Sequence, residues 1–359
     1  MNRSHNFSAG PAVLPLEVLQ RVQKEMVDYN GTGSSIIELS HRGQSYTEVQ
    51  NQADKKLRDM LGLGDDYEVL FLQGGASTQF LMVPYNFLGE GQTADYLNTG
   101  SWATKAIKEA KLFGNVNEAF SSKDVNFNRL PKQEEINFSD NPQYVHFTSN
   151  NTIFGTQYRK EPETNGVPLV CDASSDFLSR PIDTKKYGII YAGAQKNAGP
   201  AGLTIVAVRK DMLEKARTEN IPSMMSYHTH AKTLFNTPPV FGVYFFNYVL
   251  DWINDKGGLA KMEKYNQQKA EKLYAELDKD DFYHPTAETE SRSHMNVTFR
   301  LANEDLEKTF LQEAEQNGLH GLKGHRSVGG IRASIYNACP EESVDALLSF
   351  MQDFRNQHG

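Results

Sequence analysis

The chain has 359 residues, of which 39% are hydrophobic and 23% charged, and a formal net charge of −8 at pH 7. This composition is typical of a globular enzyme with two domains, and the acidic surplus argues against a nucleic-acid partner, which needs a basic face. The two cysteines, Cys171 and Cys339, cannot build a disulfide framework and lack the paired spacing of a zinc site, so we expect a reducing cytoplasm and no metal. We see no signal-peptide core, and the most apolar stretch, 241–253, is too short to span a bilayer, so no membrane partner is expected.

The first 62 residues predict an extended arm followed by two helices. Residues 1–15 form the arm, because 6–15 is rich in small residues and proline. The first helix is indicated by apolar residues at helical spacing, Leu16, Leu19, Val22 and Met26, and we expect segment 16–30 to pack on a small C-terminal domain. The second helix ends at Gly62 and has one apolar face, formed by Val49, Ala53, Leu57 and Met60.

From residue 69 onward, short apolar strands alternate with amphipathic helices, which is typical of a mostly parallel sheet. Seven strands are predicted, over residues 69–72, 93–97, 117–120, 144–148, 168–172, 188–191 and 203–208. The sequence therefore predicts an α/β domain over residues 16–258, in which helices cover both faces of a seven-stranded sheet.

A small α+β domain is predicted over residues 259–359. A long helix, 259–277, leads into it, and the elements that follow are a strand over 294–300, a helix over 305–317, a strand over 330–335 and a helix over 341–354. We expect the N-terminal arm to pack with this domain.

A single lysine, Lys196, stands among glycines and alanines on the loop between the strands 188–191 and 203–208. Glycines allow unusual backbone dihedrals and close approach of a ligand. A lysine in such a tight place can lose its proton by desolvation and form a Schiff base, most familiarly with pyridoxal phosphate (PLP). The alternative is a solvated loop lysine.

An acid that could serve such a cofactor ends the strand 168–172. Asp172 would emerge at the carboxyl edge of the sheet, where ligands bind in α/β folds. An aspartate there keeps a pyridine nitrogen protonated, which makes the ring an electron sink. The alternative is a helix N-cap, since Ala173 and two serines follow.

A glycine-rich turn, 73–78, lies between the strand 69–72 and a helix, where backbone N–H groups and the helix dipole favour an anion. We assign the PLP phosphate to it, at Gly75, Ala76 and Ser77. Trp102 begins the helix after the next strand, and its flat indole could stack on a pyridine ring or be part of the core.

Residues 192–202, which read AGAQKNAGPAG, resemble the lysine motif of the phosphoserine aminotransferase family, apart from Ala198, where a larger aliphatic residue is expected. Further matches run from 6–12 to 324–334, so the resemblance covers nearly the whole chain. It implies the aspartate aminotransferase-like type I fold of PLP enzymes and a homodimer with shared active sites. In this family pattern Lys196 holds PLP, Asp172 faces the ring nitrogen and Trp102 stacks on the ring. The remaining cofactor contacts are assigned to Thr152 at the ring, Gln195 near the phosphate, and Asn236 and Thr237 reaching across from the second subunit.

The resemblance also assigns the substrate contacts. Arg332, on a strand of the small domain, matches the arginine that binds the α-carboxylate, a task suited to a planar guanidinium. The distal anion is assigned to a cluster gathered from both ends of the chain, His41, Arg42, His325 and Arg326. The implied reaction is transamination between L-glutamate and 3-phosphohydroxypyruvate, giving 2-oxoglutarate and O-phospho-L-serine. The phosphorylated hydroxythreonine of vitamin B6 synthesis is a further candidate substrate.

Two alternatives to this function remain open. The first is another enzyme of this fold, an alanine–glyoxylate type aminotransferase or a cysteine desulfurase; a desulfurase needs a mobile reactive cysteine, whereas Cys171 lies in a predicted strand. The second is a binding module that has lost catalysis, which should also have lost Lys196 or Asp172.

Overall fold

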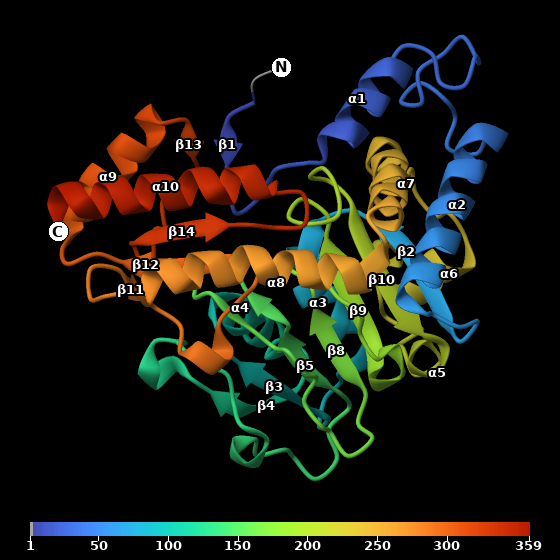
Figure 1. The fold of residues 1–359 in the computed structure, drawn as a ribbon. Coiled ribbons are helices and arrows are strands. Elements are labelled where there is room, and N and C mark those ends of the chain that lie inside the picture. The colour runs from blue at the N-terminus through green and yellow to red at the C-terminus, as the bar shows by residue number, and fades with distance from the viewer. Residues whose placement is uncertain (1–2) are drawn as a thin grey trace.

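The computed structural model describes residues 3–359 and contains a central seven-stranded sheet (Figure 1). Its strands lie in the order β2-β10-β9-β8-β5-β3-β4, with β10 antiparallel to both neighbours and the other pairs parallel. The bounds are β2 Tyr67–Leu72, β3 Thr93–Asn98, β4 Asn115–Ser121, β5 Val145–Thr148, β8 Leu169–Asp172, β9 Tyr187–Gly193 and β10 Thr204–Arg209. All seven predicted strands are found here, which confirms the α/β fold.

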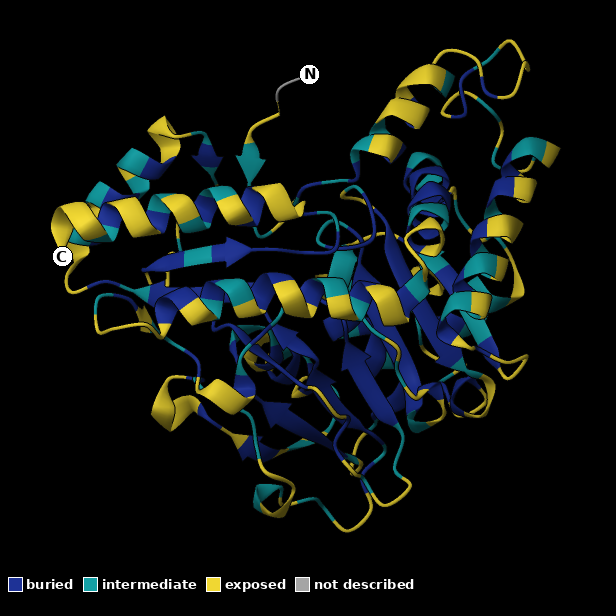
Figure 2. Ribbon diagram, viewed as in Figure 1, coloured by how far each residue is buried: buried dark blue, intermediate teal, exposed yellow. Residues whose placement is uncertain are grey.

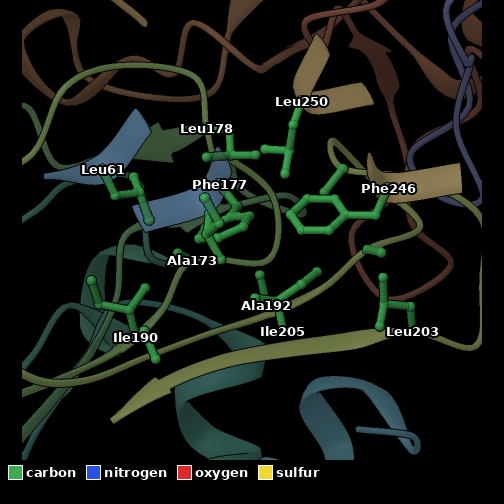
Figure 3. Packing of buried hydrophobic residues seen from close by; sticks show 14 of the residues in the cluster. Leu61, Ala173, Phe177, Leu178, Ile190, Ala192, Leu203, Ile205, Phe246 and Leu250 are labelled. Carbon is green, nitrogen blue, oxygen red and sulfur yellow. The ribbon is translucent and has the colours of Figure 1, made fainter. Parts of the chain in front are cut away.

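Helices cover both faces of this sheet. On one face, α3 (Gly75–Phe87) and α4 (Ser101–Ala110) pack over one apolar cluster. On the other face lie α2 (Gln44–Leu61) and α7 (Val240–Asp255). Figure 3 shows Phe246 and Leu250 of α7 directed at the layer formed by Ala192, Ile205 and Phe177. Figure 2 shows the consequence, in which the strands are buried and exposure is confined to the outer sides of the helices and to loops.

Helix α1 (Leu16–Glu25) packs on α7 and not on the small domain, contrary to the expectation for segment 16–30. Val18 and Val22 are buried in the same cluster as α7, and the hydroxyl of Tyr244 donates to Glu25 at 2.7 Å. The physical reason is that α7 is apolar around most of its circumference, so it offers buried surface to α1 as well as to the sheet.

The C-terminal part has a core of its own, built on a three-stranded antiparallel sheet, β11-β12-β14. Its elements are α8 Gly258–Leu277, β11 His284–Pro285, β12 Asn296–Arg300, α9 Glu304–Gln316, β13 Leu319–His320, β14 Ile331–Ser334 and α10 Glu341–His358. The N-terminal arm joins it, because β1 (His5–Asn6) pairs with β13 and Phe7 is buried in this core. Short elements complete the described chain: β6 Asn150–Asn151, β7 Thr156–Gln157, α5 Lys210–Leu213 and α6 Tyr227–Lys232.

The two cores meet over the carboxyl ends of the sheet strands. A buried amide network joins them, in which Asn150 Nδ2 donates to Asn296 Oδ1 at 2.7 Å, and Asn296 Nδ2 donates to Ser334 Oγ at 2.8 Å. The arm lies against both sides, since Ala12 N donates to Gln195 O at 2.9 Å and Ser334 N donates to Phe7 O at 3.2 Å. None of the helices within residues 3–359 is long and apolar enough to cross a membrane.

Candidate active site

A cavity of about 300 Å³ lies at the carboxyl ends of β8 and β9, below the small domain. This volume is at the lower end of the range for small-ligand sites. The walls come from the sheet edge, the start of α3, the start of α4 and the lysine loop. Seven residues singled out from the sequence line it: Gly75, Ala76, Ser77, Trp102, Asp172, Gln195 and Lys196.

Lys196 is half-buried, and its Nζ donates to Thr152 Oγ1 at 2.7 Å. The pKa of this amine is lowered to about 8, mainly by burial; the charge of Asp172 opposes the shift, and the charge of Arg332 adds to it. Space for the side chain comes from Gly10 of the arm, where a Cβ would lie 3.1 Å from Lys196 Cγ. The sequence therefore builds an enclosed amine that gives up its proton near neutral pH.

Asp172 is 4% exposed and is held by Ser174, whose N–H and hydroxyl donate to Oδ1 at 3.0 and 2.6 Å. Burial raises the pKa of this carboxyl, and the charge of Lys196 opposes the rise. The other oxygen, Oδ2, makes no hydrogen bond within residues 3–359, so it is available to a donor in the cavity. No helix begins here, and the N-cap alternative gives way to a side-chain turn onto Ser174. That serine was missed, although Asp-x-Ser is a signal for such a turn.

The first turn of α3 provides an anion site with two free donors. Gly75 was expected to offer its N–H, but that group donates to Thr204 Oγ1 at 2.7 Å. The N–H groups of Ala76 and Ser77 make no hydrogen bond within residues 3–359 and lie at the N-terminus of the helix, where the dipole favours negative charge.

Asn236 and Thr237 lie beside this turn rather than in the cavity lining. Asn236 Nδ2 donates to Gln73 Oε1 at 2.9 Å, and Gln73 Nε2 donates to Thr237 O at 3.3 Å. Within one chain, the pair therefore borders the anion site from outside.

Trp102, in the first turn of α4, is partly buried and packs on apolar clusters above and below it. Lys196 Nζ lies 5.2 Å from its ring centroid, so a planar ligand joined to this amine would be within stacking reach of the indole. Lys105 Nζ lies 4.3 Å from the same centroid. This second lysine was missed, although the i,i+3 spacing from Trp102 places both side chains on one face of the helix.

Arg332 projects from β14 toward Lys196. Its Nη1 donates to the carbonyl of Thr152 at 3.3 Å, whereas its Nε is buried with no partner within residues 3–359. Burial lowers the pKa of the guanidinium. A carboxylate would supply the acceptor that these buried donors lack, in the bidentate geometry that arginine favours.

His325 and Arg326 lie in the loop 324–330, next to Arg332. Burial lowers the pKa of His325, and the charges of Arg332, Arg326 and Lys105 lower it further, so these groups lie near one another. His41 and Arg42 are elsewhere, in the segment between α1 and α2, which Figure 1 shows on the other side of the molecule from the loop between β13 and β14. One chain therefore does not bring all four side chains together, because α1 packs on α7 and carries that segment away.

The donor set fits PLP. The amine of Lys196, with its lowered pKa, suits the aldehyde of PLP, and the buried carboxyl of Asp172 suits the ring nitrogen. The indole face of Trp102 suits the ring, and the two free N–H groups at the N-terminus of α3 suit the phosphate. Within residues 3–359, no group of three or more His, Cys, Asp or Glu side chains is placed to hold a metal ion.

Known proteins share this architecture over its whole length. The family model described as aminotransferase class-V matches residues 4–347. The phosphoserine aminotransferase of Desulfatibacillum aliphaticivorans is 55% identical, over 100% of this chain and 99% of its own. The solved phosphoserine aminotransferase from Bacillus circulans subsp. alkalophilus is 54% identical, with a TM-score of 0.97 over 99% of both chains. The PLP-bound phosphoserine aminotransferase from Trichomonas vaginalis is 41% identical, with a TM-score of 0.93 over 98% of this chain and 100% of its own. The chain belongs to the class-V aminotransferase family.

Proposed function

We propose that this protein is a phosphoserine aminotransferase, which transfers the amino group between L-glutamate and 3-phosphohydroxypyruvate with PLP as its cofactor. The products are 2-oxoglutarate and O-phospho-L-serine. The observation that carries the proposal is the enclosed amine of Lys196, held between Asp172, Trp102 and Arg332 at the carboxyl edge of the sheet. The full-length likeness to phosphoserine aminotransferases supports the same reaction.

PLP supplies the electron sink that stabilises negative charge at the substrate Cα. Lys196 would hold the cofactor through its Nζ, and its free amine would move a proton to and from the substrate Cα. Asp172 Oδ2 would accept a hydrogen bond from the N–H of the pyridinium ring and so keep the ring protonated, and Ser174 holds the carboxylate in place through Oδ1. Ala76 and Ser77 would bind the cofactor phosphate through their N–H groups, and Trp102 and Thr152 would position the ring.

Arg332 binds the α-carboxylate that every amino-acid substrate carries. His325 and Arg326 bind the distal anion, which is the phosphate of phosphoserine or the γ-carboxylate of glutamate. Cations on this side distinguish the proposal from the alanine–glyoxylate alternative, whose substrates have no distal charge. The desulfurase alternative is disfavoured because both cysteines are buried, and burial raises the pKa of Cys171 and raises that of Cys339 to about 11. Two buried free thiols also support the cytoplasmic location that we propose.

A homodimer would complete the site. The segments that carry Arg42 and Asn236 also expose large apolar side chains, among them Val27, which is 82% exposed, and Ile37, Met224 and Phe235. Exposed apolar groups on neighbouring functional segments are typical of an interface. We infer that each subunit provides His41, Arg42, Asn236 and Thr237 to its partner's cofactor and substrate.

Mixed dimers test this sharing. Neither Lys196→Ala nor Arg42→Ala homodimers should be fully active with phosphoserine. Mixing the two variants should restore activity if the residues come from different subunits, because one site then contains both native side chains. No gain on mixing, with heterodimers verified by mass spectrometry, would place Arg42 in the site of its own chain.

Absorbance spectra test the cofactor role directly. The purified protein should be yellow with PLP, and glutamate should convert the bound cofactor to its pyridoxamine form. Lys196→Ala should lose both the covalently bound cofactor and turnover. Turnover by that variant at a rate near that of the native protein would refute the assignment.

A further inference from the structure

Lys105 lies near the cations that are proposed to bind the substrate, but it has no role in the proposed reaction. It lies on α4, three residues after Trp102, with its Nζ 4.3 Å from the indole centroid. Lys196 Nζ lies 5.2 Å from the same centroid. The indole face attracts cations and so favours the position of the Lys105 ammonium beside Trp102, whose other neighbours include Lys196.

The loop that carries His325 is anchored at this same place. Val328 packs with Trp102 on the apolar cluster of Phe127, Ile153 and Phe154. The neck of the loop is closed by a hydrogen bond of 2.8 Å from Gly324 N to Gly330 O. In addition, Arg300 Nη1 donates to Val328 O at 2.8 Å. The start of α4 and the loop 324–330 therefore form one wall, with Lys105 on the helix side and His325 on the loop side.

No acid neutralises Lys105 within the described residues 3–359. At the C-terminal end of α4, Lys111 pairs with Glu118 at 3.6 Å, whereas Lys105 forms no salt bridge to any residue that the structure describes. Its charge instead acts on His325, which already lies near Arg332 and Arg326. Cations gathered without an acid repel one another, and an anion bound among them relieves that repulsion.

We propose that Lys105 is a specificity-determining residue, whose ammonium binds the phosphate group of the substrate together with His325. The inference rests on the proposed function and adds to it a cation that belongs to the same chain as Lys196. A phosphate has three terminal oxygens, so it can accept from Lys105 and from the loop cations at the same time. A substrate with no distal charge gains nothing from Lys105.

Lys105→Gln and Lys105→Arg test the proposal, with Lys108→Gln as the matched control, one turn farther along α4 and also exposed. The first readout is kcat/KM for phosphoserine divided by kcat/KM for alanine, measured with 2-oxoglutarate. The second readout is the calorimetric Kd of the PLP-loaded protein for 3-phosphoglycerate. This compound carries a hydroxyl where phosphoserine has its amine, so it cannot react with the cofactor.

We expect Lys105→Gln to lower the phosphoserine-to-alanine ratio roughly tenfold and to weaken 3-phosphoglycerate binding by a similar factor, as for the loss of one charge-assisted bond. Lys105→Arg should recover most of both, and Lys108→Gln should match the native protein. If Lys105→Gln behaves like Lys108→Gln while the native protein still uses phosphoserine, the role of Lys105 is refuted and the proposed function stands. If the native protein does not use phosphoserine, the proposed function fails and this inference fails with it.

Discussion

Replacing Lys269 by methionine should destabilise the protein by about 3 kcal/mol, because this buried ammonium holds the chain that follows β14. Lys269, on α8, is 1% exposed and has no acid partner within residues 3–359. Its Nζ donates to three carbonyls, of Ile335 at 3.0 Å, Tyr336 at 2.7 Å and Cys339 at 3.0 Å. Burial lowers the pKa of the amine to about 8, so the group is still mainly charged at pH 7.

The magnitude follows from two opposing effects. The lowered pKa of Lys269 shows that burial opposes its charged form. Hydrogen bonds from a charged donor contribute about 1.5–3 kcal/mol each, so the loss of all three outweighs the relief of the buried charge and leaves a net cost of about 3 kcal/mol. Methionine keeps most of the packing volume and removes the donors. Tyr336 O and Cys339 O keep other partners, while Ile335 O has no other partner within residues 3–359.

Thermal unfolding followed by circular dichroism provides the measurement. A loss of about 3 kcal/mol in a chain of this length lowers Tm by roughly 4 °C. Lys272→Met is the matched control, on the same helix, where an exposed lysine pairs with Glu341 and Asp345; surface pairs contribute under about 1 kcal/mol. Equal Tm values for the two variants would refute the reasoning that the Lys269 ammonium stabilises this chain segment.

Three further predictions concern the site. The rate at which cofactor-free protein takes up PLP should rise with pH through about 8 and level off near pH 9, because the pKa of Lys196 is about 8 and only about a tenth of the amine is neutral at pH 7; a rate that does not change between pH 6.5 and 9 would contradict this. Asp172→Asn should keep its turn on Ser174 and the same Tm yet lose roughly 100-fold or more in kcat, and near-native kcat would mean that another acid faces the ring nitrogen. Arg332→Ala should lower kcat/KM for phosphoserine and alanine alike, by about 2 kcal/mol in activation free energy, whereas Arg326→Ala should affect phosphoserine much more; the reverse pattern in steady-state kinetics would exchange their roles.

The sheet could be predicted because its strands are buried on both faces, and such strands appear in a sequence as short continuous apolar runs. That placed Lys196 between β9 and β10, and Asp172 at the end of β8, at the carboxyl edge. Parallel neighbours end together, so residues far apart in the sequence could be assigned to one cavity.

Other features depend on contacts that leave no local pattern. Helix α7 is buried on nearly every side, so its apolar run, 241–253, has no amphipathic period to reveal it. Strands β1 and β13 have two residues each, too few for any period. The N–H of Gly75 is used by Thr204, a contact between residues that are distant in the sequence. Lys269 looks like any other lysine of a charged helix until the fold buries it.

The residues assigned to the distal anion show a different limit of prediction from sequence. Charge and family pattern can group His41 and Arg42 with His325 and Arg326, but they cannot say which subunit provides each residue. The path of the chain decides this, because α1 packs against α7 and so places the segment before α2 far from the loop 324–330.

The proposed function is tested most directly by the initial rate at which the PLP-loaded protein transfers the amino group of L-glutamate to 3-phosphohydroxypyruvate, measured beside the same reaction with pyruvate. Release of 2-oxoglutarate can be followed with a coupled dehydrogenase, and Lys196→Ala serves as the blank. We expect efficient turnover with the phosphorylated keto acid, a far lower kcat/KM with pyruvate, and no turnover by the variant. A kcat/KM for pyruvate equal to or above that for 3-phosphohydroxypyruvate would contradict the proposed substrate, and native-like turnover by Lys196→Ala would contradict the proposed chemistry.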